Sequence, residues 1–543
     1  MVFARRSTTL LAAIIASCAM VLSLTACTSD NKTVVDGQTT VTSNSAGGVA
    51  VFTPSDGITL NQQTPLNKWA KLVPDLAKAL ADAGFKKGDI DHTTSDSLAK
   101  QSRAIQDFVV NHLSNNTTDD SGIAIAPDNM TLLVAPVVEA DASTRQYGDY
   151  ISQNLSTNDA TDEGATSDGE SSKDDSSKDD SSNTESDSTA SDEQAQAVDR
   201  LVSSLKLAKE SGMHVVLLGN SIEGYKPDAF VKFSDAQTIG KLQAEKMVSK
   251  LKLDKASKDN PKYIEVLLPY TAVDEKGNAN DSAFAQEAFR GIWQVLGSYY
   301  QKGVVESPSG TLDGKSTEND WQAVAYDAAE EGSTAKVLDK RLAKTDGQST
   351  LTRIDGIITM NDYIASEVVK ELDDLGYTGS AADINPQITI SGIVGNITGK
   401  KDLSRDAVPD PIKSPENDNA NDSSSSDDDA DEDTSASDKD RDSQWPLVTG
   451  YGAYVSNIPS IVNGKQWMTG MEDRQTIATD IAQACAKLNK DEALNSMPSI
   501  RNSEVGGVKK IPTISEPLLA VSASNLKSAL IDPGYISLAD AGL

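Results

Sequence analysis

Short apolar runs alternate with longer helical patterns along most of this 543-residue chain, and this alternation limits the fold more than any other feature. Residues 49–53, 131–137 and 214–218 have the apolar character of strands, whereas 66–83 and 236–251 place apolar residues on one helical face. Strands that alternate with helices favour parallel sheets covered by helices on both faces. The chain contains more strand–helix units than a single sheet usually holds, so the sequence predicts an α/β fold with two domains.

The remaining expected elements follow the same alternation. Expected helices are 97–112, 195–211, 284–296, 320–342, 363–375 and 473–488, with a kink or a helix start at Pro74 and a short helical turn near 523–530. Expected strands are 263–268, 356–359, 387–393 and 446–449. Ligands of such sheets bind beyond the carboxyl ends of the strands, so the residues that follow each strand are candidates for a site.

The first residues resemble a bacterial export signal with a lipidation site. Arg5 and Arg6 precede an apolar run over 10–24, which is too short and too early for an ordinary spanning helix. Small residues then lead to Cys27. The resemblance implies removal of 1–26 and a diacylglycerol on Cys27, and two or more acyl chains such as palmitate anchor a protein stably. The alternative is an ordinary secretory signal with a chance cysteine.

The resulting protein would lie on the extracytoplasmic face of the cell membrane. Residues 27–48 are rich in Ser, Thr, Asn and Gly and are expected to form a flexible, lipid-anchored linker. Cys18 would leave with the signal and Cys27 would be lipidated, so Cys485 has no partner for an intramolecular disulfide. No second apolar stretch reaches spanning length.

Two acidic segments, 158–193 and 413–443, are rich in Ser, Asp and Asn and nearly free of large apolar side chains. Such segments cannot offset the entropy of ordering by burial, so we expect disordered surface insertions. Calcium binding or an acidic interaction tail is the functional alternative, but no EF-hand spacing is present. The formal net charge of −32 makes nucleic acid a poor partner.

An ordered set of short motifs resembles the type I periplasmic binding proteins of ABC transporters, most closely their xylose- and monosaccharide-binding branch. The motifs are FSD at 233–235 followed by KLQA at 241–244, NDW at 319–321, IDGIITMND at 354–362, VTGYGA at 448–453, NGKQWMT at 463–469, and IP at 511–512 with PGY at 533–535. They keep the family's order and spacing over roughly 49–543 once the acidic segments are set aside.

The resemblance implies two Rossmann-like lobes joined by three hinge crossings, near 220–230, 468–473 and 512–517. The N-terminal lobe would comprise 49–222 and 472–512, and the C-terminal lobe 223–471 and 513–543. The implied function is capture of a sugar or similar polar small molecule between the lobes and its delivery to ABC permease subunits. The protein would act as a monomer without a cofactor.

Nine residues are candidates for ligand contact. They are Trp69, Asn220, Asp235, Asn280, Asp281, Trp321, Asn361, Asp362 and Tyr451. Trp321 matches the family's sugar-stacking tryptophan, with a core role as the alternative. For Asn361 we favour ligand contact and for Asp362 capping of the next helix, whereas both roles stay open for Asp235. Last, we expect Trp321 and Asn361 at the centre of the cleft.

Three departures from the family concern charged residues. The family's arginine, aspartate and lysine that grip sugar hydroxyls correspond to Asn220, Gly452 and Glu472 here. The resemblance therefore does not fix xylose as the ligand. Another sugar, an oligosaccharide or another polar molecule stays open, and Tyr451 would supply a stacking or hydroxyl contact.

No catalytic arrangement is evident, so we do not expect an enzyme. His92, His112 and His214 are the only histidines, and neither a nucleophile elbow nor a metal-ligand spacing is present. Two alternatives to a transport receptor share the fold: a signalling receptor that presents its ligand to a membrane sensor, and a non-transport surface lipoprotein with a degenerate cleft. Neighbouring genes would separate import from sensing.

Overall fold

The computed structural model describes residues 46–55, 65–115, 125–138, 144–156, 185–271, 282–328, 330–343, 351–381 and 445–542. The expected signal, Cys27, Asn280, Asp281, the expected strand 387–393 and the acidic segment 413–443 lie outside these ranges.

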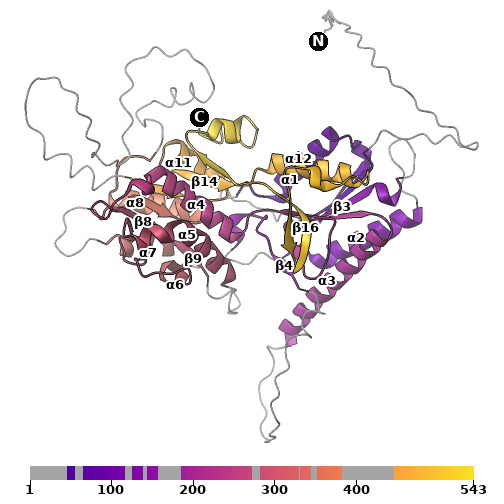
Figure 1. Cartoon of the computed structure of the whole chain (residues 1–543), viewed down its shortest axis with the longest axis horizontal. Coiled ribbons are helices and arrows are strands. Elements are labelled where there is room, and N and C mark those ends of the chain that lie inside the picture. The colour runs from indigo at the N-terminus through magenta and orange to yellow at the C-terminus, as the bar shows by residue number, and fades with distance from the viewer. Residues whose placement is uncertain are drawn as a thin grey trace, which may run out of the picture. The chain divides into compact units, whose positions relative to one another are not determined.

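The larger of two principal sheets has seven strands in the order β15-β16-β7-β5-β3-β1-β2 (Figure 1). Their bounds are β1 Gly48–Pro54, β2 Ile90–Ser95, β3 Met130–Val134, β5 His214–Leu218, β7 Ala229–Lys232, β15 Ile500–Val505 and β16 Val508–Ser515. Neighbours pair in parallel except β15 with β16. Parallel pairing brings the carboxyl ends of β1, β2, β3 and β5 to one edge.

Helices cover both faces of this sheet, as the continuous apolar strands require. Val49 and Val51 of β1 pack in one core cluster with α1 (Trp69–Asp82) and α12 (Arg474–Leu488). Ala50 and Phe52 pack in another with α2 (Leu98–Asn115) and α3 (Glu185–Glu210). The two-residue alternation of a strand thus explains the two separate cores.

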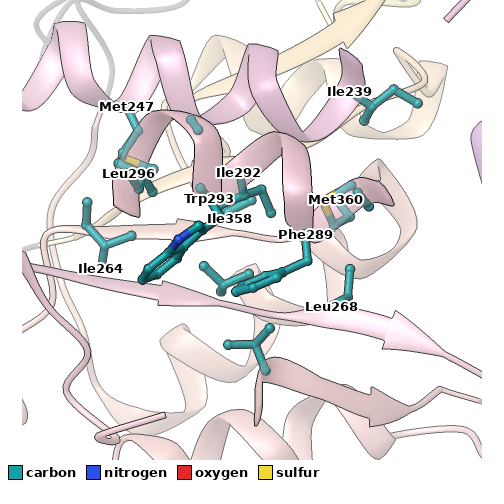
Figure 2. Packing of buried hydrophobic residues seen from close by; sticks show 14 of the residues in the cluster. Ile239, Met247, Ile264, Leu268, Phe289, Ile292, Trp293, Leu296, Ile358 and Met360 are labelled. Atoms are coloured by element: carbon teal, nitrogen blue, oxygen red, sulfur yellow. The ribbon is translucent and has the colours of Figure 1, made fainter. Parts of the chain in front are cut away.

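The second sheet has four parallel strands in the order β10-β8-β12-β13. Their bounds are β8 Lys262–Val266, β10 Val305–Glu306, β12 Gly356–Ile358 and β13 Leu447–Thr449. On one face, α4 (Ala236–Leu251) and α5 (Ala283–Gln301) pack on Ile264 and Ile358, with Phe289 and Trp293 in the centre (Figure 2). The other face carries α7 (Ser333–Arg341) and α8 (Asp362–Leu375).

Smaller elements complete both halves. β9 (Leu268–Tyr270) pairs with β11 (Ala325–Asp327), β14 (Met468–Met471) with β17 (Leu519–Ser522), and β4 (Asn154–Leu155) with β6 (Ser221–Ile222). Short helices are α6 (Trp321–Val324) and α11 (Ile458–Val462), and a π-helical turn spans Lys527–Ile531. The structure is thus an α/β fold with two helix-covered sheets, as the sequence predicted.

The chain passes between the two halves after β7, after β14 and after β16. The first passage differs from the expected 220–230, because β7 at Ala229–Lys232 still pairs with β5 and β16 in the larger sheet. It therefore lies at 233–235, directly before α4. The other two passages, at 472–473 and 516–518, fall near the expected positions.

Two expected elements need correction. The expected disordered segment 158–193 overlaps α3, which begins at Glu185 and so starts ten residues before the expected helix 195–211. The expected helix 320–342 is broken into α6, β11 and α7. β11 pairs with β9, and Gly332 precedes α7 with a φ of 73°, a left-handed conformation that interrupts a helix.

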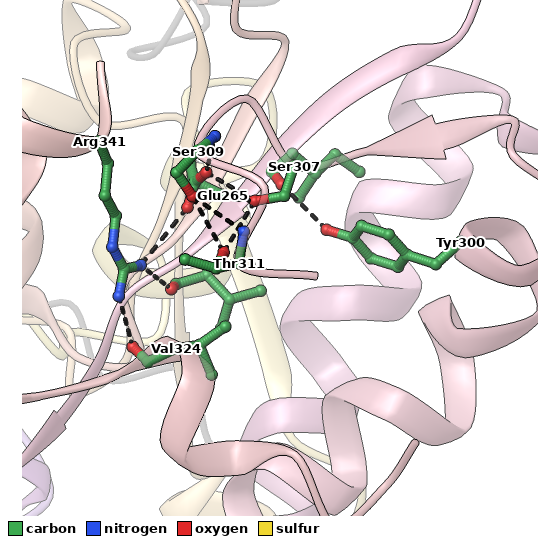
Figure 3. Close-up of polar contacts among 9 residues, drawn as sticks. Glu265, Tyr300, Ser307, Ser309, Thr311, Val324 and Arg341 are labelled. Carbon is green, nitrogen blue, oxygen red and sulfur yellow. Dashed lines mark hydrogen bonds and ion pairs between the residues drawn. The ribbon is translucent and has the colours of Figure 1, made fainter. Parts of the chain in front are cut away.

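A buried ion pair stabilises the edge of the second sheet (Figure 3). The fully buried Glu265 accepts hydrogen bonds from the Ser307 hydroxyl at 2.6 Å and the Ser309 backbone at 2.9 Å, and faces Arg341 at 3.4 Å. Arg341 also donates to the carbonyls of Val266 and Val324. Both the Glu265 carboxylate and the Arg341 guanidinium thus have partners, as buried charges require. Their bonds join β8, the loop after β10 and α7.

Two glycines let α4 and α5 approach closely. A Cβ at Gly240 would lie 2.2 Å from the Ala288 carbonyl oxygen, and one at Gly291 would lie 2.0 Å from that of Gln237. This contact fixes the first two turns of α4 against the second and third turns of α5. No described helix is both long and apolar enough to cross a membrane.

We expect Gly291→Ala to destabilise the protein by about 1–3 kcal/mol, because the new methyl group overlaps the α4 backbone. At an unconstrained helix position the same change stabilises by about 0.5–1 kcal/mol, so the sign is diagnostic. Urea unfolding measures it, with Gln294→Ala on the exposed side of α5 as control. A stabilised Gly291→Ala variant would contradict the close contact.

Candidate functional site

A cavity of about 220 Å³ lies at the carboxyl edge of the seven-stranded sheet. Its walls come from the ends of β1, β2, β3 and β5, from the start of α1 and from the connection after β3. The lining residues are Pro54, Ser55, Lys68, Trp69, Ser95, Asp96, Val137, Val138, Thr144, Gly148, Asp149, Ile151, Gln153 and Asn220. The position is the one at which parallel α/β sheets bind ligands.

A second cavity of about 720 Å³ adjoins the first. Thr144, Ile151 and Gln153 line both. Its other walls are Ser152 and Asn154 beside the larger sheet, the start of α4 (Asp235, Ala236, Gln237) and the start of α5 (Ala283, Phe284, Glu287). The two cavities together therefore have walls from both α/β halves.

Trp69 lines the first cavity but is held in an aromatic cluster. Its ring meets those of Tyr150 and Phe233 edge to face, with centroids 5.1 and 5.7 Å apart. Its backbone N–H donates to Asp149, which also pairs with Lys68 at 2.7 Å. Only 3% of Trp69 is exposed, so only a small part of the residue can reach a ligand.

Asn220 also lines the first cavity. Its Nδ2 donates to the Pro136 carbonyl at 2.9 Å, and its Oδ1 accepts from the Gln153 backbone at 2.9 Å. An amide has two N–H groups and two lone pairs, so half of its capacity is used by these bonds. Asn220 thus fixes the connection after β3 against the end of β5.

Asp235 lines the second cavity and caps α4. Its carboxylate accepts from the Thr238 backbone at 2.7 Å and pairs with Lys232 at 2.8 Å. Burial acts to raise the pKa of Asp235, but the bonds from Lys232 and Thr238 outweigh it and lower that pKa below its ordinary value. Capping is therefore established by the geometry, and ligand contact at this carboxylate stays a prediction.

Helix α8 is capped by Asn361 and not, as expected, by Asp362. Asn361 is the N-cap of α8, and its Oδ1 accepts from the Ile364 backbone at 3.0 Å. Asp362 instead points to the loop after β13, where it accepts from the Tyr454 backbone, Thr469 and Gln466. Burial raises the pKa of Asp362 to about 6 although these bonds lower it. The sequence could not separate two adjacent polar residues before one helix.

Tyr451 is fully buried at the first two passages between the halves. Its hydroxyl lies 2.5 Å from Ser234 Oγ, and the Ser234 backbone N–H donates to Glu472 at 2.5 Å. Burial is the main cause that raises the pKa of Tyr451. The bond from Ser234 to Glu472 therefore joins the passage at 233–235 to the passage at 472–473, and Tyr451, which contacts Ser234, lines neither cavity.

Trp321 is half-buried at the start of α6, where its ring packs edge to face on Tyr270 at 5.3 Å. It lines neither cavity, so its stacking on a ligand stays a prediction. Asn280 and Asp281 lie outside the described residues. Of the nine candidates, the cavities bring together Trp69, Asn220 and Asp235.

Sequence reasoning missed the connection after β3, which supplies Thr144, Asp149, Ile151 and Gln153 to the walls. These residues follow a strand, which was a usable signal. Their own stretch has no apolar periodicity and runs into the acidic segment, so no element was expected there. Within the described ranges, no group of three His, Cys, Asp or Glu side chains could hold a metal ion.

No protein-family model matches the chain, and no curated protein does. Similar solved structures include an ABC transporter solute-binding protein from Clostridium phytofermentans with bound β-D-glucose, at 17% identity and a TM-score of 0.43 over 91% of this chain and 99% of that one. A carbohydrate transporter solute-binding protein from Chloroflexus aurantiacus in complex with D-glucose has 18% identity and a TM-score of 0.43 over 92% and 98%.

A periplasmic ribose ABC transporter protein from Conexibacter woesei is similar at 13% identity and a TM-score of 0.42, over 90% of this chain and 96% of that one. These three structures bear the names of transport proteins and not of enzymes.

Glu472 provides a test of the passage at 472–473. Burial raises its pKa from 4.5 to about 7, so the protein loses stability as pH rises from 4.5 through 7, by at most about 3 kcal/mol. Glu472→Gln keeps an acceptor for Ser234 without the charge. We expect it to raise the free energy of unfolding at pH 8 and to reduce the pH slope in that window.

Urea unfolding at pH 5 and pH 8 measures this effect. Glu245→Gln, at an exposed carboxylate of α4, is the matched control and should keep the wild-type difference between the two pH values. An unchanged slope in Glu472→Gln would show that this carboxylate is not buried as described.

Proposed function

We propose that the protein is a lipid-anchored, extracytoplasmic solute-binding protein that holds a sugar or similar polar molecule between its two α/β halves. It would act as a monomer and deliver the ligand to the permease subunits of an ABC importer. Support comes from cavities with walls from both halves at the carboxyl edge of a parallel sheet. The names of the similar structures point to the same class.

The observation that carries this proposal is a pair of carboxamides, one from each half, that line the second cavity. Gln153 belongs to the first half and Gln237 to the second, and both line the cavity. Within the part of the chain that the structure describes, neither side-chain amide has a hydrogen-bond partner. A carboxamide both donates and accepts, so this pair suits ligand hydroxyls.

The charged groups on the walls favour a neutral ligand. Asp149 is paired with Lys68, Asp235 with Lys232, and Glu287 with Arg290. A paired carboxylate gains little from a cationic ligand, and an anionic ligand would meet these carboxylates. A neutral polyol, such as a sugar, fits such walls best.

The passages between the halves would act as hinges. We propose a first lobe of 46–232 with 474–515 and a second of 236–471 with 519–542, revised from the sequence-based boundaries by the strand pairings. The bond from Ser234 to Glu472 and the contact of Ser234 with Tyr451 join two passages. Closure of lobes about a few such residues is the usual motion of hinged binding proteins.

One observation favours a second candidate, a surface lipoprotein with a degenerate cleft. Two residues that the sequence marked as candidates for ligand contact use their polar groups within the protein. Asp362 binds the Tyr454 backbone, and the Tyr451 hydroxyl binds Ser234. A protein of this kind would bind no solute, so a binding experiment separates the two candidates.

We expect calorimetric titration with D-glucose, D-ribose, L-arabinose, D-allose and myo-inositol to find a ligand. For that ligand, Gln153→Ala and Gln237→Ala should each weaken binding roughly 2- to 12-fold, the effect of one neutral hydrogen bond. Gln322→Ala, on an exposed position of α6 outside both cavities, is the control. Binding of none of these solutes would favour the degenerate cleft.

The anchor gives an independent prediction. Cys27→Ser should abolish lipidation, so the protein should appear in the soluble extracytoplasmic fraction and not with membranes. Fractionation with immunoblotting, together with mass measurement of the mature N-terminus, checks it. Equal membrane association of wild type and variant would refute the lipid anchor and leave the solute-binding proposal intact.

A further inference from the structure

Residues 144–151, here called the strap, leave the larger sheet after β3 and contact both halves. Toward the first half, Asp149 accepts from Lys68 Nζ at 2.7 Å and from the Trp69 backbone at 3.1 Å. The Tyr150 hydroxyl donates to the Lys68 carbonyl at 2.6 Å. The strap is thus anchored at the start of α1.

Toward the second half, the strap reaches the start of α8. Gln146 Oε1 accepts from Asn361 Nδ2 at 3.1 Å, and the Gln146 carbonyl accepts from the Tyr454 hydroxyl at 2.6 Å. The amide of Asn361, which the sequence assigned to a ligand, is therefore bound by an amide of the chain itself.

The ring of Tyr147 fills an aromatic recess next to Asn361. Its centroid lies 4.7 Å from that of Phe284 and 6.3 Å from that of Tyr451, and only 1% of the residue is exposed. Phe284 also lines the second cavity, so Tyr147 lies behind a wall of that cavity. Removal of this ring would extend the cavity toward Asn361.

The hydroxyl of Tyr147 is buried near a polar group but lacks a hydrogen-bond partner among the described residues. Burial raises its pKa, the nearby Asn361 amide lowers it in part, and no hydrogen bond of good geometry forms. Burial of a hydroxyl without a hydrogen bond costs free energy. If this position served only the hydrophobic core, phenylalanine would therefore be the better residue. An aromatic recess with an amide at its end has instead the chemistry of a sugar subsite.

We propose that Gln146 and Tyr147 occupy, from within the chain, the part of the ligand site at Asn361, and thereby limit the length of the ligand. This inference rests on the proposed function and deepens it. The ligand occupies the two open cavities, makes no contact with Asn361, and is excluded from the recess by the Tyr147 ring. Tyr147 is then a residue that determines specificity.

The test compares Tyr147→Ala with Tyr147→Phe in the full chain. Calorimetric titration uses the five solutes above together with maltose and cellobiose. We expect Tyr147→Ala to increase the affinity for a disaccharide relative to its monosaccharide at least tenfold, because the recess opens. Tyr147→Phe keeps the ring and should retain the wild-type ratio.

A second pair of variants decides the matter if Tyr147→Ala does not fold. Asn361→Ser keeps a helix-capping oxygen but removes the amide donor. It should leave ligand affinity unchanged in the wild-type background and lower it at least threefold in Gln146→Ala, in which Asn361 is released.

The outcomes separate the two proposals. Sugar binding with an unchanged disaccharide ratio in Tyr147→Ala, or a loss of affinity in Asn361→Ser alone, overturns the inference and leaves the proposed function. Binding of no sugar by wild type or variants overturns the proposed function and this inference with it. An equal change in Tyr147→Phe and Tyr147→Ala would assign the effect to the hydroxyl and also overturn the inference.

Discussion

The buried carboxylate of Asp362 is the interaction on which the arrangement around the cavities depends. It accepts hydrogen bonds from the Tyr454 backbone in the loop after β13 and from Gln466 and Thr469 at the start of β14. A buried charge is tolerated only with such partners, so these two segments are held against the start of α8. The Tyr454 side chain in turn holds the strap. The hydrogen bonds of Asp362 thus fix the position at which the strap, from the first half, contacts the second half.

The same requirement shapes the backbone nearby. A Cβ at Gly450 would lie 2.2 Å from Asp362 Oδ1, so the position accepts only glycine without a shift of the carboxylate. Glu472 repeats the pattern at the passage between the halves, where Ser234 is its donor. Both carboxylates have pKa values raised by burial, to about 6 and about 7, and link the ionisation of the protein to its folded arrangement near neutral pH.

The regular hydrophobic patterns of the sequence made much of the fold predictable. The polar residues of the site were less predictable, because they follow no such pattern. The amphipathic period of 236–251 matches α4 in full, and the continuous apolar run at His214–Leu218 is β5. The strand β7 was missed because Ala229–Lys232 is short and lies only three residues before α4. Of the site, Asn220 was found because it follows the expected strand 214–218, and Asp235 because it belongs to the FSD motif at 233–235, whereas Gln153 and the strap have no period at all. Such residues acquire their place from contacts distant in sequence, which a pattern does not contain.

The seven-stranded sheet has one consequence for how the protein is made. Thr513 of β16 pairs with Phe230 of β7, and α12 covers the same face as α1, so late residues complete a core begun by early ones. Contacts between such distant parts form slowly, since long loops must close first. A growing chain lacks these partners and cannot bury that core until synthesis has passed β16. If the protein is exported as proposed, this incomplete core would keep the chain able to pass through a membrane channel during translation.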